Sequence, residues 1–187
     1  MTERGLSSQG PLAKATALRA VARCFVASLA MLARGRIRWP QANVGRVVRF
    51  ANGTAARVYR ETAVAATSSE PCFLVVTFRL RGICGRGHAL FRWESILNTP
   101  LFVGFPGFVS KLWLAHDDQG AYRGPYEWDG AEQAEHYARS LWRVLELVRK
   151  RGSIDYRVVP GLRRDDVLKK PACWPVTRQR TKQTGGG

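Results

Sequence analysis

Residues 108–144 read FVSKLWLAHDDQGAYRGPYEWDGAEQAEHYARSLWRV, and this stretch decides the fold class. Its first part, 108–116, is apolar and aromatic, as is typical of a strand, and 117–120 (DDQG) has the composition of a turn. The chain is then predicted to return as a second strand over 121–128. Pro125 in that strand indicates an edge position or a bulge, because proline cannot donate to a sheet ladder. The stretch therefore begins with a β-hairpin.

A helix is predicted to follow the hairpin over residues 131–150, where apolar side chains recur at helical spacing and Asp129 is placed as the N-terminal cap. A long strand precedes the hairpin at 72–82. A helix over 86–97 is expected between that strand and the hairpin, and a last strand is expected at 153–161.

The resulting order over residues 72–160 is β-α-β-β-α-β, which is the ferredoxin-like arrangement of an α+β fold. It predicts an antiparallel four-stranded sheet with two helices on one face. Large apolar side chains occupy both faces of the strands, so either a second subunit or the N-terminal segment must cover the other face. Residues 47–64 add a β-hairpin whose turn is Asn52-Gly53.

The 187-residue chain has a net charge of +16, and this charge lies at its ends. Residues 1–60 carry a net +10, residues 61–147 a net −2 and residues 148–187 a net +8. A nucleic-acid-binding domain more often carries positive charge on its folded core. Nucleic acid is therefore the less favoured partner.

Three regions follow from this composition: a basic N-terminal extension (1–45), an α+β domain (46–168) and a disordered basic tail (169–187). The extension contains an amphipathic helix over 13–34. We expect this helix to pack on the domain; a membrane-surface contact through residues 13–38 and a targeting segment are the alternatives. Its apolar face comprises Leu18, Val21, Ala22, Phe25, Leu29 and Leu32.

The four cysteines form no CxxC pair, and only three histidines are present, so neither a metal site nor a cofactor is expected. Unpaired cysteines are typical of a reducing compartment, which predicts a cytoplasmic protein, with membrane association as the alternative. Residues 85–88 (GRGH) lack the lysine of a phosphate-binding loop, so these glycines are assigned to a turn.

A few polar side chains lie beside aromatic residues in the predicted core, as in small-molecule pockets. The alternative is that each belongs to the core, a strand edge or the surface. The candidate catalytic residues are His88, Lys111 and Arg79, and the candidate substrate-binding residues are Trp93, Trp113, Tyr122, Tyr126 and Phe105.

Two segments, GFPGFVSKLWL and YRGPYEWDGAEQAEHYARSLWRV, resemble the second half of the dimeric α/β-barrel superfamily, and are closest to small bacterial proteins described as monooxygenases. This resemblance implies a homodimer whose two sheets face each other. It also implies aromatic or polyketide-like ligands and, in some members, oxidation by O₂ without a cofactor. The matching positions are Ser110, Lys111, Trp113, Gly124, Tyr126 and Tyr137.

We therefore expect a small-molecule-binding homodimer, with cofactor-independent monooxygenation of an aromatic or enolisable substrate as its activity. In this hypothesis His88 is the base, and Arg79 or Lys111 stabilises the substrate anion. The alternative function is a non-catalytic interaction module whose basic flanks contact a membrane surface or nucleic acid.

Overall fold

The computed structural model describes residues 12–50, 52–79, 99–145 and 155–169. The predicted helix at 86–97 lies outside these residues. The elements, in chain order, are α1 (Lys14–Ala33), β1 (Ile37–Arg38), β2 (Val47–Arg49), β3 (Ala55–Val64), β4 (Pro71–Arg79), η1 (Thr99–Leu101), β5 (Phe108–Leu114), β6 (Ala121–Asp129), α3 (Ala131–Leu145), β7 (Asp155–Pro160) and α4 (Arg164–Lys169).

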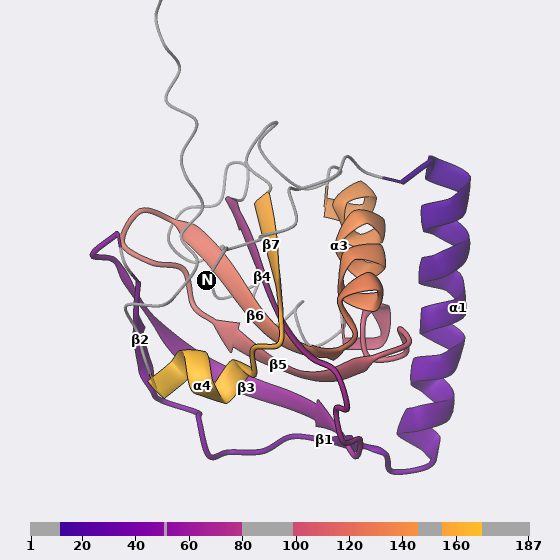
Figure 1. The fold of residues 1–187 in the computed structure, drawn as a ribbon, viewed down its shortest axis with the longest axis horizontal. Helices are drawn as coiled ribbons and strands as arrows, with labels where there is room; N and C mark the ends of the chain where they lie inside the picture. Colours follow the sequence, from indigo (N-terminus) through magenta and orange to yellow (C-terminus); the bar gives the residue numbers. More distant parts are fainter. Residues whose placement is uncertain (1–11, 51, 80–98, 146–154, 170–187) are drawn as a thin grey trace, which may run out of the picture.

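The strands form one antiparallel sheet in the order β1-β3-β5-β6-β4-β7, and β2 pairs with β3 outside this path (Figure 1). The sheet has seven strands and is larger than the predicted one. The reason is β3, the second strand of the N-terminal hairpin. It continues past the hairpin and pairs with β5, with Thr62 opposite Lys111.

Helices α1 and α3 pack side by side on one face of the sheet (Figure 1). Helix α1 buries its small residues Ala17, Cys24 and Ser28, whereas Phe25 and Leu29 of its predicted packing face are exposed. The expected packing face of this helix was therefore wrong. Close approach is the physical reason, because a Cβ atom on Gly104, in the loop after η1, would lie 2.2 Å from the Cys24 carbonyl oxygen.

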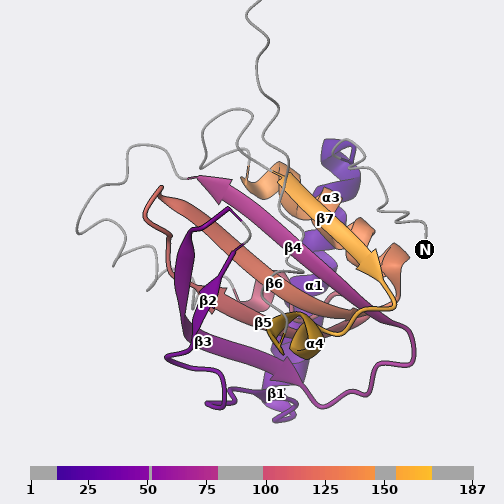
Figure 2. The same ribbon diagram turned by 60° about the vertical axis from the view of Figure 1, so that its left-hand side comes forward.

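The opposite face of the sheet is covered by β2 and α4, as Figure 2 shows for α4. Val48 lies on β2, and Val167 and Leu168 lie on α4; all three pack against buried side chains such as Phe73 and Leu112. The sequence predicts that either a second subunit or the N-terminal segment covers this face. In the structure the N-terminal hairpin and a short C-terminal helix, which was not predicted, pack on it.

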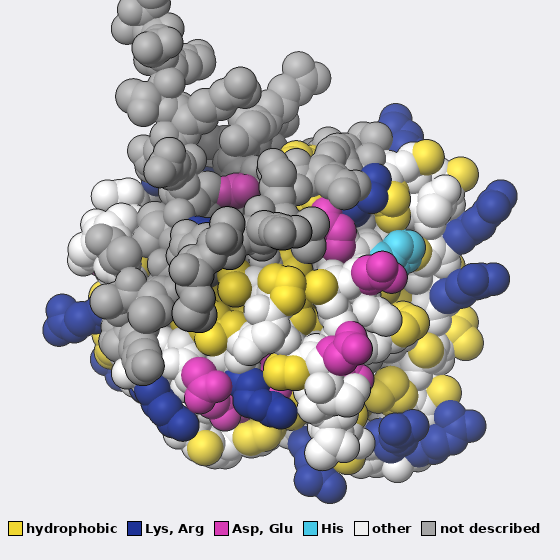
Figure 3. Space-filling model, viewed as in Figure 1, with side chains coloured by type: hydrophobic (Ala, Val, Ile, Leu, Met, Phe, Trp, Pro, Cys, Tyr) yellow, Lys and Arg dark blue, Asp and Glu magenta, His cyan; other side chains and the backbone are white. Residues whose placement is uncertain are grey.

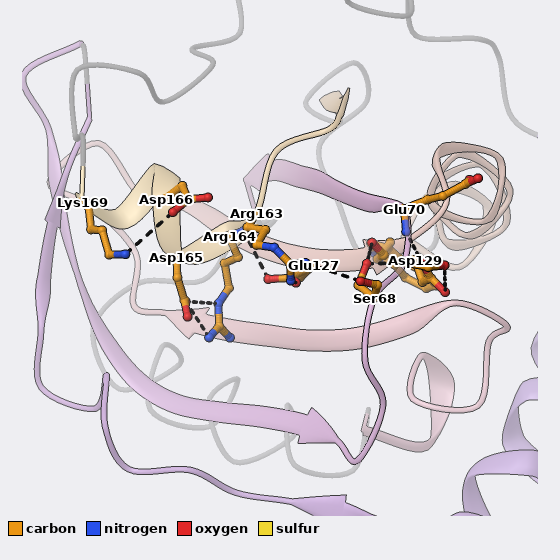
Figure 4. A network of polar contacts seen from close by, with 11 residues as sticks. Ser68, Glu70, Glu127, Asp129, Arg163, Arg164, Asp165, Asp166 and Lys169 are labelled. Carbon is orange, nitrogen blue, oxygen red and sulfur yellow. Dashed lines mark hydrogen bonds and ion pairs between the residues drawn. The ribbon is translucent and has the colours of Figure 1, made fainter.

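Ion pairs hold α4 against the sheet. The buried Arg164 guanidinium lies 2.7 Å from the Glu61 carboxylate. The backbone N–H of Arg164 donates to the Glu127 carboxylate at 3.3 Å. Arg163 pairs with Glu127 at 3.5 Å. Figure 4 shows both arginines beside Glu127. Because Glu61 and Glu127 are almost fully buried, their charges require these partners, and α4 is thereby fixed in position.

Two local predictions differ from the structure. The Asp129 carboxylate accepts hydrogen bonds from Ser69 and from the Glu70 N–H, so it ties down the segment before β4 (Figure 4). Pro125 lies opposite Val75 on an interior strand, not at an edge. The pairing of β6 with β5 runs from Trp128 to Tyr126, so it ends one residue before Pro125, whose missing N–H could not continue it.

The predicted turn between β5 and β6 is organised by Asp117, which is buried. Its carboxylate accepts hydrogen bonds from the Gln119 and Ala121 N–H groups and pairs with Arg123. Burial alone would raise the pKa of Asp117, but the Ala121 hydrogen bond and the Arg123 guanidinium outweigh it and hold the pKa below 3.8.

We expect Asp117→Asn to lower the free energy of unfolding by about 2 kcal/mol at neutral pH, because the buried ion pair is lost. A carboxylate with a lowered folded-state pKa stabilises the fold above its unfolded pKa, and the stabilisation is lost as the pH falls through the folded pKa. The difference from wild type should therefore shrink below about pH 4. Urea unfolding across this range measures it, with Asp118→Asn, an exposed neighbour, as the control. Equal effects of the two variants would contradict the assignment.

Candidate functional site

Lys111 lies in the middle of β5, and its side chain is only 8% exposed. Its Nζ atom lies 3.4 Å from the centre of the Trp113 ring, two residues along the same strand face. The Phe102 ring lies at 4.4 Å and the Tyr126 ring at 4.8 Å. Phe102 follows η1, and Tyr126 is opposite Lys111 in the β5–β6 register. Three segments of the chain thus surround one amine with aromatic rings.

The environment of Lys111 favours the neutral amine. Burial, and to a smaller extent the charge of Arg60, lower the pKa of Lys111 well below 10.5. Arg60 is opposite Trp113 on β3, and its guanidinium carbon lies 4.2 Å from the centre of the Trp113 ring. Within the described ranges, no side-chain hydrogen bond or carboxylate reaches the Lys111 Nζ atom. The site therefore holds a buried amine without a polar partner among those residues.

A pair of phenols lies beside this amine. The Tyr137 hydroxyl, on α3, donates to the Tyr126 hydroxyl at 2.9 Å. Burial raises the pKa of both side chains above 10, so both keep their protons at neutral pH. Because the Tyr126 oxygen accepts from Tyr137, its own O–H can donate to another group. Lys111 and Tyr126 together offer an amine and a phenolic donor.

The surrounding contacts fix the rings around Lys111. The Trp113 indole N–H donates to the Thr62 hydroxyl at 3.1 Å. A Cβ atom on Gly124 would lie 3.1 Å from Tyr126 Cε2 and 3.6 Å from Lys111 Cε. Glycine at position 124 therefore leaves room for the tyrosine ring to lie over the strand. We refer to Phe102, Lys111, Trp113 and Tyr126 as the lysine–aromatic cluster.

The structure brings three of the eight candidate residues together, namely Lys111, Trp113 and Tyr126. His88 and Trp93 lie outside the described residues.

The remaining three candidates lie elsewhere. Tyr122 stacks on Phe78, with ring centres 5.6 Å apart. The Phe105 ring packs edge-to-face on the Tyr137 ring, with ring centres 5.2 Å apart. Arg79 is the last residue of β4 and, by strand alternation, shares the sheet face of Phe73 and not that of the cluster.

Sequence reasoning missed Phe102 and Arg60. Phe102 lies in an apolar loop, residues 101–108, whose composition alone indicates that it lies over a core or a pocket. Arg60 comes from β3, and its place beside Trp113 depends on the β3–β5 register, which no local pattern specifies.

Comparisons with protein-family models, with curated proteins and with solved structures found no match.

Free cysteines and clusters of metal-ligating side chains are two further kinds of reactive site. Cys24 and Cys72 are free, buried thiols, and burial raises the pKa of Cys72 to about 12, so this thiol stays protonated and unreactive. In the described part of the chain, no three His, Cys, Asp or Glu side chains gather into a possible metal site.

Proposed function

We propose that this protein binds a small aromatic molecule carrying an acidic phenol or enol, and that Lys111 takes up its proton. The observation that carries the proposal is the buried Lys111 amine, enclosed by three aromatic rings and without a charged partner among the described residues. A neutral amine is a base, and flat aromatic ligands match ring-lined sites.

The proposed chemistry extends this binding step to a cofactor-independent oxygenation. Lys111 removes a proton from the substrate, and the resulting ammonium remains beside the anion, where the Tyr126 hydroxyl also donates to it. The carbanion then transfers an electron to O₂, and the two radicals combine to a peroxide anion. The Lys111 ammonium returns its proton to this anion, and the resulting hydroperoxide loses water. One activated methylene and one O₂ thus give one carbonyl and one water. In this scheme Lys111 acts as the base, a role expected of His88 from the sequence. Lys111 also stabilises the substrate anion.

The strand order supports the resemblance to the dimeric α/β-barrel superfamily. Within the larger sheet, β7-β4-β6-β5 follow the order of a ferredoxin-like sheet, with β3 and β1 added beside β5. A homodimer stays a prediction of the resemblance. A sheet-to-sheet dimer would have to form over the face on which β2 and α4 already pack. Free thiols at positions 24 and 72 are compatible with the predicted reducing, cytoplasmic location.

Binding is tested with matched ligand pairs: phenols, 1,3-diketones and hydroxyanthrones, each beside its O-methyl ether, measured by calorimetry. We expect the acidic member of a pair to bind at least about tenfold more tightly, because only it can form the ion pair with Lys111. A coloured phenol such as 4-nitrophenol should absorb as its phenolate when bound below its solution pKa.

The matched variants are Lys111→Met and Lys169→Met, the second of which removes an exposed lysine. We expect Lys111→Met to abolish the phenolate signal and the preference over the ether, and Lys169→Met to keep both. Equal binding of acid and ether to the wild type, or unchanged binding to Lys111→Met, would overturn the proposal.

A further inference from the structure

Helix α1 presents three different sectors around its circumference. One sector packs on the protein through Ala17, Cys24 and Ser28, and the Ser28 hydroxyl donates to the Pro100 carbonyl at 2.8 Å. The next sector consists of large apolar side chains that are 43% to 72% exposed. These side chains are Leu18, Phe25, Val26, Leu29 and Leu32, of which Leu18, Phe25 and Leu32 are spaced two turns apart.

The third sector of α1 is basic. Arg19 and Arg23 are one turn apart and exposed, and residues 4–60 contain no Asp or Glu. Figure 3 shows Lys and Arg side chains projecting from the right-hand side of the molecule, where α1 lies in Figure 1, with hydrophobic side chains between them. An exposed apolar face with arginines along one edge, on a helix without acidic residues, complements a negatively charged apolar surface.

We propose that α1 docks this domain onto an anionic membrane surface, with its exposed apolar sector inserted among the lipids and its arginines at the headgroups. The helix lies along the interface, because its first sector, with Ala17, Cys24 and Ser28, stays attached to the domain. This docking is independent of the ligand site, since the cluster around Lys111 shares no residue with the exposed sector of α1.

Two other arrangements of α1 fit its contacts and charges less well. By length and composition α1 is able to cross a membrane. Crossing, however, would break the contact of Ser28 with Pro100 and carry Arg19 and Arg23 into hydrocarbon. A second copy of the chain on the same sector would bring two helices together that have basic and no acidic residues, so the rims would repel.

Co-sedimentation of the full chain with lipid vesicles tests the proposal. The probes are vesicles of phosphatidylcholine alone and of phosphatidylcholine mixed with phosphatidylglycerol. We expect binding to the anionic vesicles only, weakened by added salt. Phe25→Ser/Leu29→Ser should reduce binding at least about tenfold, because the inserted apolar area is lost. Arg19→Glu/Arg23→Glu should do the same, since each basic residue near an anionic surface strengthens binding about fivefold.

Matched controls lie at similarly exposed positions away from α1. Val47→Ser and Arg49→Glu, both on β2, should leave vesicle binding unchanged. All variants change exposed side chains and should keep the wild-type unfolding temperature. Failure to bind anionic vesicles, binding that α1 variants do not weaken, or a dimer that dissociates in Phe25→Ser/Leu29→Ser would each overturn the proposal. Salt-dependent binding to duplex DNA in place of vesicles would also overturn it.

Discussion

Replacing Lys111 with methionine is expected to stabilise the protein at neutral pH, although the residue is buried and contacts three rings. The gain is about 1.4 kcal/mol for each pH unit by which the folded pKa of Lys111 lies below its unfolded value. The unfolded chain carries a protonated lysine, whereas the folded site favours the neutral amine. Folding therefore weakens proton binding at this group, which costs free energy at neutral pH. Methionine has a similar shape and carries no such cost.

The lowered pKa also determines how the stability difference between Lys111→Met and wild type changes with pH. Between the lowered folded pKa and the unfolded value near 10.4, the unfolded state binds one more proton, so wild-type stability rises with pH by about 1.4 kcal/mol per unit. The advantage of Lys111→Met should therefore decrease with pH and level off above about pH 10.4.

Urea unfolding of both proteins between about pH 7 and pH 10 measures this difference, because other titrating groups cancel in the comparison. Lys169→Met should show a difference that changes little with pH, since its side chain is exposed. If Lys111→Met were less stable than wild type by a constant amount, the amine would be charged and held by its aromatic neighbours.

Gly104→Ala should destabilise the protein by about 3 kcal/mol, the upper range for overpacking. The added Cβ atom would lie 2.2 Å from the Cys24 carbonyl oxygen and 2.7 Å from the Ser28 backbone nitrogen. Both are backbone atoms of α1, so no side-chain rotation relieves the overlap and the helix must move. Thermal unfolding measures the loss, and faster tryptic cleavage at Arg19 and Arg23 reports movement of α1.

Ser28→Ala is the matched comparison for Gly104→Ala. It removes the hydroxyl that bonds to Pro100 and Gly104 but adds no atom, so we expect a loss of only about 1 kcal/mol. Equal losses in the two variants would show that the hydrogen bonds, and not close packing, determine how α1 sits.

Local patterns in the sequence predicted the strands that contain Lys111, Tyr126 and Phe73, together with both hairpin turns. These features depend on alternation and on turn residues, which act over a few positions. The side of α1 that packs was missed because it depends on Gly104, about eighty residues away, which admits only small side chains against it.

The candidate site was predictable to the same extent. Lys111 and Trp113 share a strand face by simple alternation, and Tyr126 joins them through the short turn of the hairpin. Phe102 and Arg60 reach the cluster through a loop and a long-range strand pairing, whose register is set by the whole sheet.

The central claim is that burial among aromatic rings favours the neutral form of the Lys111 amine over the ammonium. A titration of the Lys111 Cε chemical shift by NMR tests it directly, with Lys111→Met used to assign the resonance. The account predicts a midpoint well below 10.5, with the exposed lysines titrating near their usual value. A Lys111 midpoint at or above 10.5 would contradict it.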